Sequence, residues 1–424
     1  MCISSTELIM AFTQLVTFLT EALKFLGIFR PGVPRIVLCK CHPLTDNRED
    51  DTVSVRRFLS TLEAGMTSLR FIDTFAGIGG FRVAAEALGM TCVASIEWDK
   101  ECQKTYKENF GDAPLGDITT INPGDLPEHD ILFGGFPCQP FSRNGKYNHN
   151  SGTIAAGDTR QDLYKSLISI LSCHRPKFFL FENVKELLTI RDGNNNLFID
   201  SILSDMDDNG YNVSHKVINA RDFGLPQQRN RVYFVGVRKD IDVKFVFPAG
   251  VAKGSYIKDI LDPVVDAKYN LTERWAGRTL LIQRPDRVNH TRAVGSPRLD
   301  ALEEIYAAGL ATPSSRKPDI IPLAIIYGDT PSGLPRQQDK LYSIEGVSPT
   351  LATFELTVPA FAVGGGKNDW RVLTPSECGR VQGFPSNYKF SNIDATTYKQ
   401  LGNAVSPPVI KHILQALLDG AKVF

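Results

Sequence analysis

A cysteine set between two prolines is the residue best placed for covalent chemistry. Residues 130–133 are a mostly apolar run, and two glycines and a phenylalanine separate them from Pro137, Cys138, Gln139 and Pro140. The run predicts a buried parallel strand, and open α/β sheets bind ligands at the carboxyl ends of such strands. Although a lone cysteine is more often a buried structural residue, this position predicts a catalytic thiolate.

A carboxylate and two arginines follow later buried runs. Residues 177–181 are apolar after the first and predict a strand, and Glu182 comes directly after them. A carboxyl at the tip of a buried strand is costly unless it is paired or protonated. Glu182 is therefore either a general acid with a raised pKa or a structural ion-pair partner or N-cap. Arg229 and Arg231 alternate, so they face one side of an extended segment and could clamp an anionic group.

A glycine-rich turn joins the first predicted strand to a helix. Residues 69–73 predict the strand, residues 74–81 the turn, and the helix begins at Arg82. Such a turn brings backbone amides and a helix N-terminus to a ligand. The Gly-x-Gly-x-x-Gly pattern of pyrophosphate sites is not met, and Asp73 stands at the head of the turn. This favours a cofactor with a cationic or amino-bearing end.

The second predicted strand, residues 92–96, ends in Glu97 and Trp98. An acid at this point can accept hydrogen bonds from ribose hydroxyls. Trp98 either stacks on a purine or is a half-buried surface residue. Strands alternate with helices over residues 69–237, which predicts an α/β fold with a doubly wound, mostly parallel sheet.

The composition of the chain limits its class. Its 424 residues include 47 Lys plus Arg and 47 Asp plus Glu, so binding to nucleic acid would need a local basic surface. The eight cysteines are scattered, which indicates a reducing compartment rather than a disulfide framework. The most apolar segment, residues 9–29, contains Glu21 and Lys24 and does not predict a membrane span.

Residues 1–68 stand apart from the alternating pattern. Apolar residues at helical spacing predict an amphipathic helix over residues 6–25 that packs on the protein or on a partner. Cys39, Cys41 and His42 have no second pair of ligands nearby, so we expect no metal site. We therefore predict an extension outside the core of the protein.

Taken together, these segments resemble the DNA cytosine-5 methyltransferase family. The likeness is carried, in this order, by residues 73–81, 97–98, 116–118, 134–142, 181–184, 227–231, 371–385 and 400–409. It extends from residue 69 to the C-terminus, apart from a variable middle. Each motif alone is weak, whereas the ordered set is very specific. The resemblance implies a Rossmann-like methyltransferase fold with a smaller, irregular target-recognition domain.

The resemblance also implies the reaction. A methyl group would pass from S-adenosyl-L-methionine, which leaves as S-adenosyl-L-homocysteine, to C5 of a cytosine in duplex DNA. Cys138 would add to C6, because that addition makes C5 nucleophilic. Protonated Glu182 would hydrogen-bond N3 of the ring. Arg229 would lie near the cytosine, Arg231 would hold the catalytic segment, and Gln227 completes the predicted catalytic set.

A cofactor pocket follows from the same likeness. Glu97 would hold the ribose hydroxyls, and Trp98 would pack on the adenine. Asp117 and Ile118 would hold the adenine edge. The predicted cofactor-binding residues are Phe75, Ala76, Gly77, Gly79, Gly80, Glu97, Trp98, Asp117, Ile118, Pro137, Leu163, Asn403 and Val405.

Contacts to DNA are expected outside that pocket. The target cytosine cannot be reached inside a duplex, so the enzyme should flip it out. Residues 143–159 would close over it as a lid, and residues 328–335 would form a recognition loop. The predicted DNA-binding residues are Ser142, Arg160 and the six arginines of a local basic patch, Arg274, Arg278, Arg284, Arg287, Arg292 and Arg298.

Three domains are predicted from the resemblance. They are an extension over residues 1–68, a catalytic domain over 69–261 completed by 396–424, and a target-recognition domain with a hinge over 262–395. We expect a cytoplasmic, nucleoid-associated monomer of prokaryotic or phage type, without a metal or a membrane contact. A cognate restriction endonuclease would share its DNA site without binding it directly.

Other classes of protein share some of these features. An RNA cytosine-5 methyltransferase would run the same chemistry, but the basic middle region and the Pro-Cys-Gln-Pro-Phe-Ser sequence favour DNA. A catalytically silent DNA-binding relative would tolerate loss of Cys138, Glu182 or Arg229, and all three are present. A dinucleotide oxidoreductase is disfavoured because the pyrophosphate pattern is missing.

Overall fold

The computed structural model describes most of the chain from Ser68 onward, and Ser68–Phe424 forms one compact unit. The predicted N-terminal helix and Cys39, Cys41 and His42 lie outside the described residues. No helix within the described residues is long and apolar enough to cross a bilayer. The described ranges are 68–136, 163–191, 195–251, 254–271, 279–283, 291–294, 320, 322–327, 340–353, 358–364 and 370–421.

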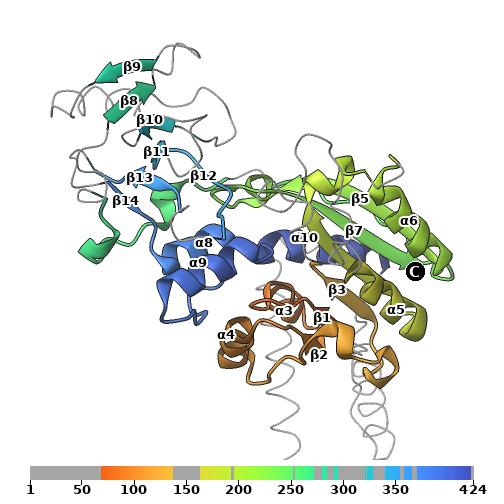
Figure 1. The fold of residues 1–424 in the computed structure, drawn as a ribbon. Helices are drawn as coiled ribbons and strands as arrows, with labels where there is room; N and C mark the ends of the chain where they lie inside the picture. The colour runs from red at the N-terminus through yellow and green to blue at the C-terminus, as the bar shows by residue number, and fades with distance from the viewer. Residues whose placement is uncertain are drawn as a thin grey trace, which may run out of the picture. The chain divides into compact units, whose positions relative to one another are not determined.

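Six strands form the central sheet, in the order β2-β1-β3-β4-β7-β5 (Figure 1). The parallel pairs are β1 with β2, β1 with β3 and β3 with β4, whereas β7 is antiparallel to β4 and β5. The sheet is therefore mostly parallel, as predicted. The strands are β1 Arg70–Thr74, β2 Thr91–Ile96, β3 Ile131–Gly134, β4 Phe178–Val184, β5 Tyr211–Asn219 and β7 Asn230–Arg238.

One face of this sheet is covered by α5 (Leu163–His174) and α6 (Phe198–Asp208). Ile72, Leu132 and Phe179 point to this face and belong to one buried apolar cluster with both helices. Because side chains alternate across a strand, the neighbouring residues must be apolar as well when both faces are covered. This explains the continuous apolar runs that predicted the strands.

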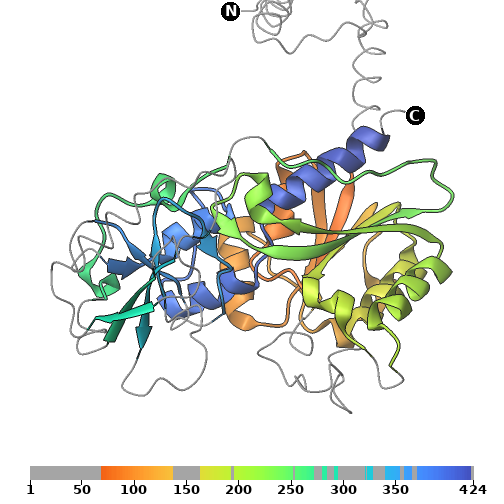
Figure 2. The same ribbon diagram turned by 90° about the horizontal axis from the view of Figure 1, so that it is seen from above.

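The opposite face is covered by α3 (Gly80–Glu86) and α10 (Pro407–Ala421). Phe71, Phe133 and Leu180 point to it and pack with apolar residues of these two helices. Figure 2 shows the blue α10 on one side of the sheet and the yellow-green α5 and α6 on the other. Helices on both faces make the sheet doubly wound, which confirms the predicted fold class.

A second sheet occupies the middle of the sequence, where the resemblance predicted an irregular domain. Its order is β14-β13-β11-β10-β8-β9. Most of its pairs are antiparallel, and β11 with β13 is the parallel one. The strands are β8 Thr279–Gln283, β9 Thr291–Val294, β10 Pro322–Tyr327, β11 Lys340–Ser343, β13 Ala360–Ala362 and β14 Trp370–Val372.

Two short helices and a two-stranded ladder join the second sheet to the first. Helices α8 (Pro375–Gln382) and α9 (Asp394–Asn403) share an apolar cluster with β11 and β13. Strand β12 (Ser348–Pro349) pairs in parallel with β6 (Gln227–Gln228), which lies just before β7. The chain between the sheets is thus tied directly to the strand that carries Arg231.

Candidate active site

A cleft of about 210 Å³ opens at the carboxyl ends of the parallel strands. Its walls come from the turn after β1, the ends of β2, β3 and β4, the start of β7, and α9 with the segment after it. The strand order reverses at β1, which is the switch point where doubly wound sheets bind ligands. The predicted site residues that line it are Phe75, Ala76, Gly77, Gly80, Glu97, Trp98, Glu182, Arg229, Arg231, Asn403 and Val405.

The glycine-rich turn forms the floor of this cleft through an unusual backbone. Phe75 has φ +51° and Gly77 has φ +55°, and the Ala76 amide donates to the Ile96 carbonyl at 2.9 Å. A bulky residue in the left-handed region is strained, so the surrounding contacts must hold Phe75 in place. A Cβ at Gly80 would lie 2.7 Å from Val405 Cγ2 and 2.9 Å from its carbonyl oxygen. Glycine therefore allows α3 to approach the Val405 segment.

Glu97 projects from the end of β2 into the cofactor side of the cleft. Its side chain is held by two backbone amides, Gly77 at 2.8 Å from Oε2 and Asp99 at 2.8 Å from Oε1. Burial raises the pKa of Glu97, and these amide donors lower it in part. Each oxygen keeps capacity for a further hydrogen bond. Trp98, beside it, is 71% exposed, so its indole is available as a stacking surface.

Helix α9 closes the rim of the cleft against α4 (Lys100–Phe110). Lys399 Nζ lies 2.8 Å from Asp99 Oδ2, and Gln400 Nε2 donates to the Glu101 carbonyl at 3.0 Å. Lys399 and Gln400 line the cleft, as does Cys102, and none of the three was predicted as a site residue. The sequence signal for Gln400 was its place at the start of the 400–409 motif, whereas Lys399 and Cys102 carried none.

Glu182 lies at the catalytic side, two residues before the end of β4. It is 8% exposed and pairs across the sheet with Tyr233. Arg231 Nε lies 3.1 Å from Glu182 Oε1. Burial raises the pKa of Glu182, whereas the guanidinium groups of Arg231 and then Arg229 lower it, and burial is the larger effect. The carboxyl thus holds a proton more tightly than an ordinary glutamate.

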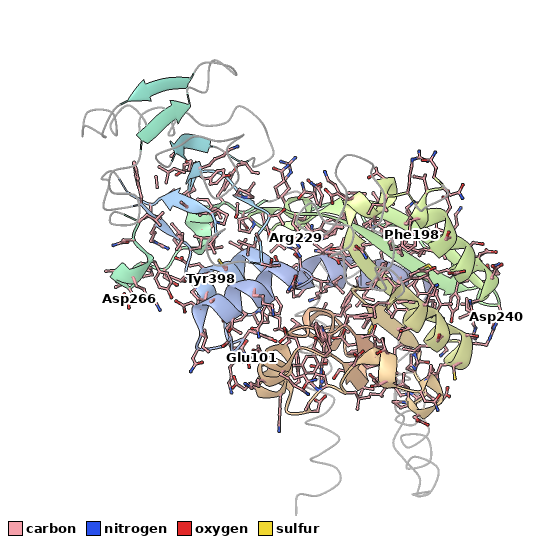
Figure 3. All side chains as sticks on the ribbon, viewed as in Figure 1. Glu101, Phe198, Arg229, Asp240, Asp266 and Tyr398 are labelled. Atoms are coloured by element: carbon pink, nitrogen blue, oxygen red, sulfur yellow. The ribbon has the colours of Figure 1, made fainter. Side chains whose placement is uncertain are left out.

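Arg229, labelled in Figure 3, is buried and holds the C-terminal end of α9 together with the residue that follows the helix. Its Nη2 donates to the Gly402 carbonyl at 3.1 Å and to the Ala404 carbonyl at 2.8 Å. Asn403 lies between these two carbonyls and lines the cleft. Arg229, on the catalytic side of the cleft, therefore fixes the wall that contains Asn403, which also borders the cofactor side.

The described residues that precede Cys138 in the sequence line this same cleft. Gly135 and Phe136, just after β3, line the cleft, and Asn183 Nδ2 donates to the Phe136 carbonyl at 3.2 Å. Asn183 follows Glu182 directly, so the two strand ends are tied together. The predicted site residues that lie outside the described residues are Pro137, Cys138, Ser142, Arg160, Arg274, Arg278, Arg284, Arg287 and Arg298. For Arg292, on β9, only the backbone is described, and the predicted segments 143–159 and 328–335 also lie outside.

Two residues that the sequence associated with the site lie away from the cleft. Gln227 was predicted to be catalytic, but it is fully buried and does not line the cleft. Its side chain amide is occupied by Gln382 and the Leu351 amide, at 2.6 and 3.0 Å. Asp73 was expected to face the cofactor, but it is also fully buried, and burial raises its pKa well above the usual range against the opposing charge of Arg82.

Four predicted cofactor residues lie beside the cleft rather than on it. Asp117 accepts from the Thr119 amide at 2.9 Å, and Ile118 and Leu163 pack with the apolar cluster below the sheet. Gly79 lies behind the turn, where a Cβ would come 2.3 Å from the Phe110 ring. Their roles toward a cofactor stay predictions.

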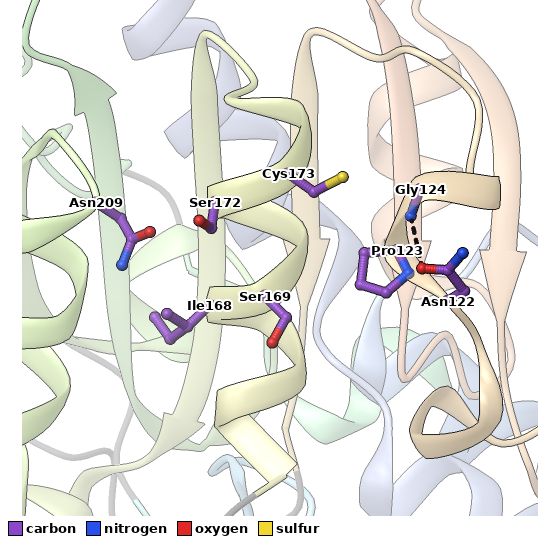
Figure 4. Close-up of a pocket in the computed structure, with 8 residues that line it drawn as sticks. All are labelled: Asn122, Pro123, Gly124, Ile168, Ser169, Ser172, Cys173 and Asn209. Atoms are coloured by element: carbon purple, nitrogen blue, oxygen red, sulfur yellow. Dashed lines mark hydrogen bonds between the residues drawn. The ribbon is translucent and has the colours of Figure 1, made fainter.

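A second hollow lies between α5 and the loop before β3 (Figure 4). No acid, arginine, lysine or histidine is among its lining residues, which are Asn122, Pro123, Gly124, Ile168, Ser169, Ser172, Cys173 and Asn209. It therefore lacks the paired titratable groups of the main cleft. Across the described residues no group of three or more His, Cys, Asp and Glu side chains could hold a metal ion.

Comparison with known proteins decides the family. Residues 69–419 match the family model of the C-5 cytosine-specific DNA methylases. The chain belongs to this family. The type II methyltransferase M.HhaI of Haemophilus parahaemolyticus is 34% identical over 352 residues, which cover 82% of this chain and 94% of the relative. M.HaeII of Haemophilus aegyptius is 36% identical over 361 residues, which cover 84% and 94%.

Solved structures agree with the fold. The Dnmt2 methyltransferase of S. pombe matches with a TM-score of 0.54 at 16% identity, over 83% of this chain and 98% of that one.

The family membership makes this DNA cytosine methylase an enzyme that transfers a methyl group to C5 of cytosine in DNA. It supports the DNA prediction, not the RNA or catalytically silent alternatives.

Proposed function

We propose that the methylase binds S-adenosyl-L-methionine on the Glu97 side of the cleft. The residues fit such a ligand, because Glu97 keeps free acceptor capacity and Trp98 offers an exposed ring. Gly77 and Gly80 let the backbone come close to the ligand. When bound, the cofactor supplies an activated methyl group for C5. Asn403 and Val405 complete the pocket wall.

Cys138 and Glu182 perform the covalent part of the reaction. The Cys138 sulfur bonds to C6 of the cytosine, and the π electron pair of the C5=C6 double bond shifts toward C4 and N3, which leaves C5 nucleophilic. Glu182 offers its proton to N3, where negative charge would otherwise build up. After C5 takes the methyl group, a base removes the C5 proton, the C5–H electron pair re-forms the C5–C6 double bond, Cys138 leaves as the thiolate, and N3 returns its proton to Glu182. The enzyme thus returns to its starting state.

Arg231 and Arg229 keep the proton on Glu182 exchangeable. A buried carboxyl without positive neighbours would hold its proton too tightly to cycle, and an exposed one would not carry it at neutral pH. The observation that carries the proposal is the cleft that these groups share. Arg231 Nε lies 3.1 Å from Glu182 Oε1 there, and Asn183 donates to the carbonyl of Phe136, which stands two residues before Cys138 in the sequence.

The second sheet is proposed to read the DNA. A base-flipping enzyme must contact the duplex around the extruded nucleotide, and the predicted arginine patch falls in this part of the sequence. The named relatives are type II methyltransferases. By analogy, the methylase would act as the modification half of a restriction-modification system, as a monomer and beside an endonuclease that recognises the same site.

Expression in a host without cytosine methylation tests the proposal. Bisulfite sequencing of that host's DNA should show protected cytosines at one short sequence, which also reveals the recognition site. Competition between duplex DNA and tRNA for tritiated methyl transfer separates the substrate classes. Labelling of tRNA with none in DNA would contradict the proposal.

A further inference from the structure

Two buried glutamines connect the second sheet to the cleft. Gln227, on β6, and Gln382, at the end of α8, are both fully buried, and neither lines the cleft. A buried primary amide is costly unless every polar atom finds a partner, so an apolar residue would serve packing better. Such a pair calls for an explanation other than packing.

The hydrogen bonds of this pair have one direction only. The Leu351 amide can only donate, so it fixes the oxygen of Gln227 toward itself, at 3.0 Å. The Gln227 nitrogen must then donate to Gln382 Oε1, at 2.6 Å. The nitrogen of Gln382 in turn donates to the Ala404 carbonyl. We call this chain from Leu351 to Ala404 the glutamine relay; backbone groups fix both of its ends.

The Leu351 end of the relay lies in the segment that follows strand β11 of the second sheet. The chain runs from β11 through β12, where the Ser348 amide donates to the Pro226 carbonyl at 2.8 Å, and on to Leu351. Thr350 Oγ1 adds a bond to the Gln228 carbonyl at 2.7 Å. Any shift of β11 or β12 would therefore act on β6, one residue before Arg229.

The other end belongs to the cleft wall. The Ala404 carbonyl that accepts from Gln382 also accepts from Arg229 Nη2, at 2.8 Å, and Asn403 and Val405 on either side of it line the cleft. A Cβ on Gly402 would lie 2.5 Å from the Ala352 carbonyl oxygen, so the segment after Leu351 packs directly on this wall. The relay thus bridges two parts of the chain that already touch.

We propose that Gln227 and Gln382 are positioning residues. They couple the position of the second sheet to the positions of Arg229 and of residues Asn403–Val405 in the cleft wall. This coupling deepens the proposed function and rests on it. It acts on the rate of methyl transfer within the assembled complex rather than on the binding of DNA. Neither glutamine lines the cleft.

Single-turnover methyl transfer tests the coupling, with a synthetic duplex carrying the site found for the wild-type enzyme. Gln227→Met and Gln382→Met keep the side-chain length and remove the relay. Gln382→Glu is milder, because it keeps the acceptor for Gln227 and loses only the donor to Ala404. We expect each Met substitution to lower the methyl-transfer rate constant about tenfold, and Gln382→Glu to lower it by less than that but by more than about twofold, with duplex affinity changed by less than about twofold.

The double variant supplies the sharper readout. If both glutamines act through one relay, the double Met variant should be no slower than the slower single one. Tyr211→Phe is the matched control, since it removes a buried hydrogen bond to the Pro176 carbonyl, 2.7 Å long, without a link to the cleft. It should lower the melting temperature and leave the rate constant unchanged.

Two results would overturn the coupling. One is a rate constant within about twofold of wild type in all three single variants, with only the melting temperature lowered. The other is strictly multiplicative effects of the two Met substitutions. Failure of the wild-type enzyme to methylate any DNA would instead refute the proposed function, so the two failures are distinguishable.

Discussion

Glu97 and Glu182 lie at almost the same depth, 7% and 8% exposed, at the carboxyl ends of two strands of one sheet. Burial raises the pKa of both. Their partners differ in kind. Glu97 accepts from the backbone amides of Gly77 and Asp99, whereas Glu182 pairs with the side chain of Arg231, with Arg229 nearby.

This difference separates a binding group from a reacting group. Backbone amides have no titration and little freedom to move, so Glu97 is held as a fixed acceptor. The guanidinium groups of Arg231 and Arg229 offset part of the effect of burial on the pKa of Glu182, which stays raised. Under the proposed function, the same residue type serves ligand recognition on one side of the cleft and proton chemistry on the other.

The comparison predicts that Glu182→Gln has the largest effect. Gln keeps the volume but has no acidic proton for N3, so kcat on DNA should fall about 10²–10⁴-fold, as for loss of a general acid. The affinity for the cofactor should change little, because Glu97 is untouched. Steady-state transfer of tritiated methyl groups measures both. A loss of cofactor affinity with unchanged kcat would exchange the roles of the two carboxylates.

Glu97→Gln should show the opposite pattern. The new amide nitrogen would face one of the two backbone amides, and a charged acceptor for the ribose would be lost. We expect about 10–100-fold weaker binding of S-adenosyl-L-homocysteine, with kcat at saturation changed much less. Isothermal titration calorimetry gives the affinity. Unaltered affinity would contradict a cofactor role for this residue.

The cofactor side also depends on close backbone approach, which Gly80→Ala would disturb. The added methyl group would meet Val405 Cγ2 and the Val405 carbonyl at 2.7 and 2.9 Å, so the wall or the helix must move. We expect a loss of about 1–3 kcal/mol in stability and a weaker cofactor complex. Gly116→Ala is the control, because its Cβ would meet no atom within 4 Å. Equal melting temperatures for the two variants would count against this packing.

The smallest predicted effect is on the pH profile of kcat. Glu182 must be protonated, so the rate should fall as pH rises through its raised pKa, while formation of the Cys138 thiolate drives the rate up with pH. The two limbs give a bell shape. Glu182→Gln should keep the rising limb and lose the falling one. A falling limb that persists in the variant would assign it to another group.

Local patterns in the sequence predicted much of this site. Apolar runs followed by Glu97 and Glu182 placed both carboxylates at strand ends, because a strand covered on both faces must be apolar until it reaches the ligand edge. The motif order then implied the family. Gly80 and Val405, more than 300 positions apart, were both assigned to the pocket only through the resemblance.

The sequence did not predict the positions of residues whose partners lie far away in the chain. Gln227 was included in the catalytic set that the resemblance implies, yet its side-chain amide bonds to Gln382 and the Leu351 amide, which no local pattern reveals. Lys399 lines the cleft only because α9 packs on α4. Asp73 is a further example. Its place at the head of the turn suggested a contact with the cofactor, but the alternation of side chains along β1 directs it into the core, where it is fully buried.

The central claim is a transient bond between the Cys138 sulfur and C6 of the cytosine. A duplex with 5-fluorocytosine at the target position tests it most directly, since a fluorine at C5 cannot leave as a proton does and the bond persists. Mass spectrometry of the digested complex should find the methylated nucleotide on the peptide that contains Cys138, and Cys138→Ala should give no adduct. An adduct on another cysteine, or one that survives in Cys138→Ala, would contradict the account.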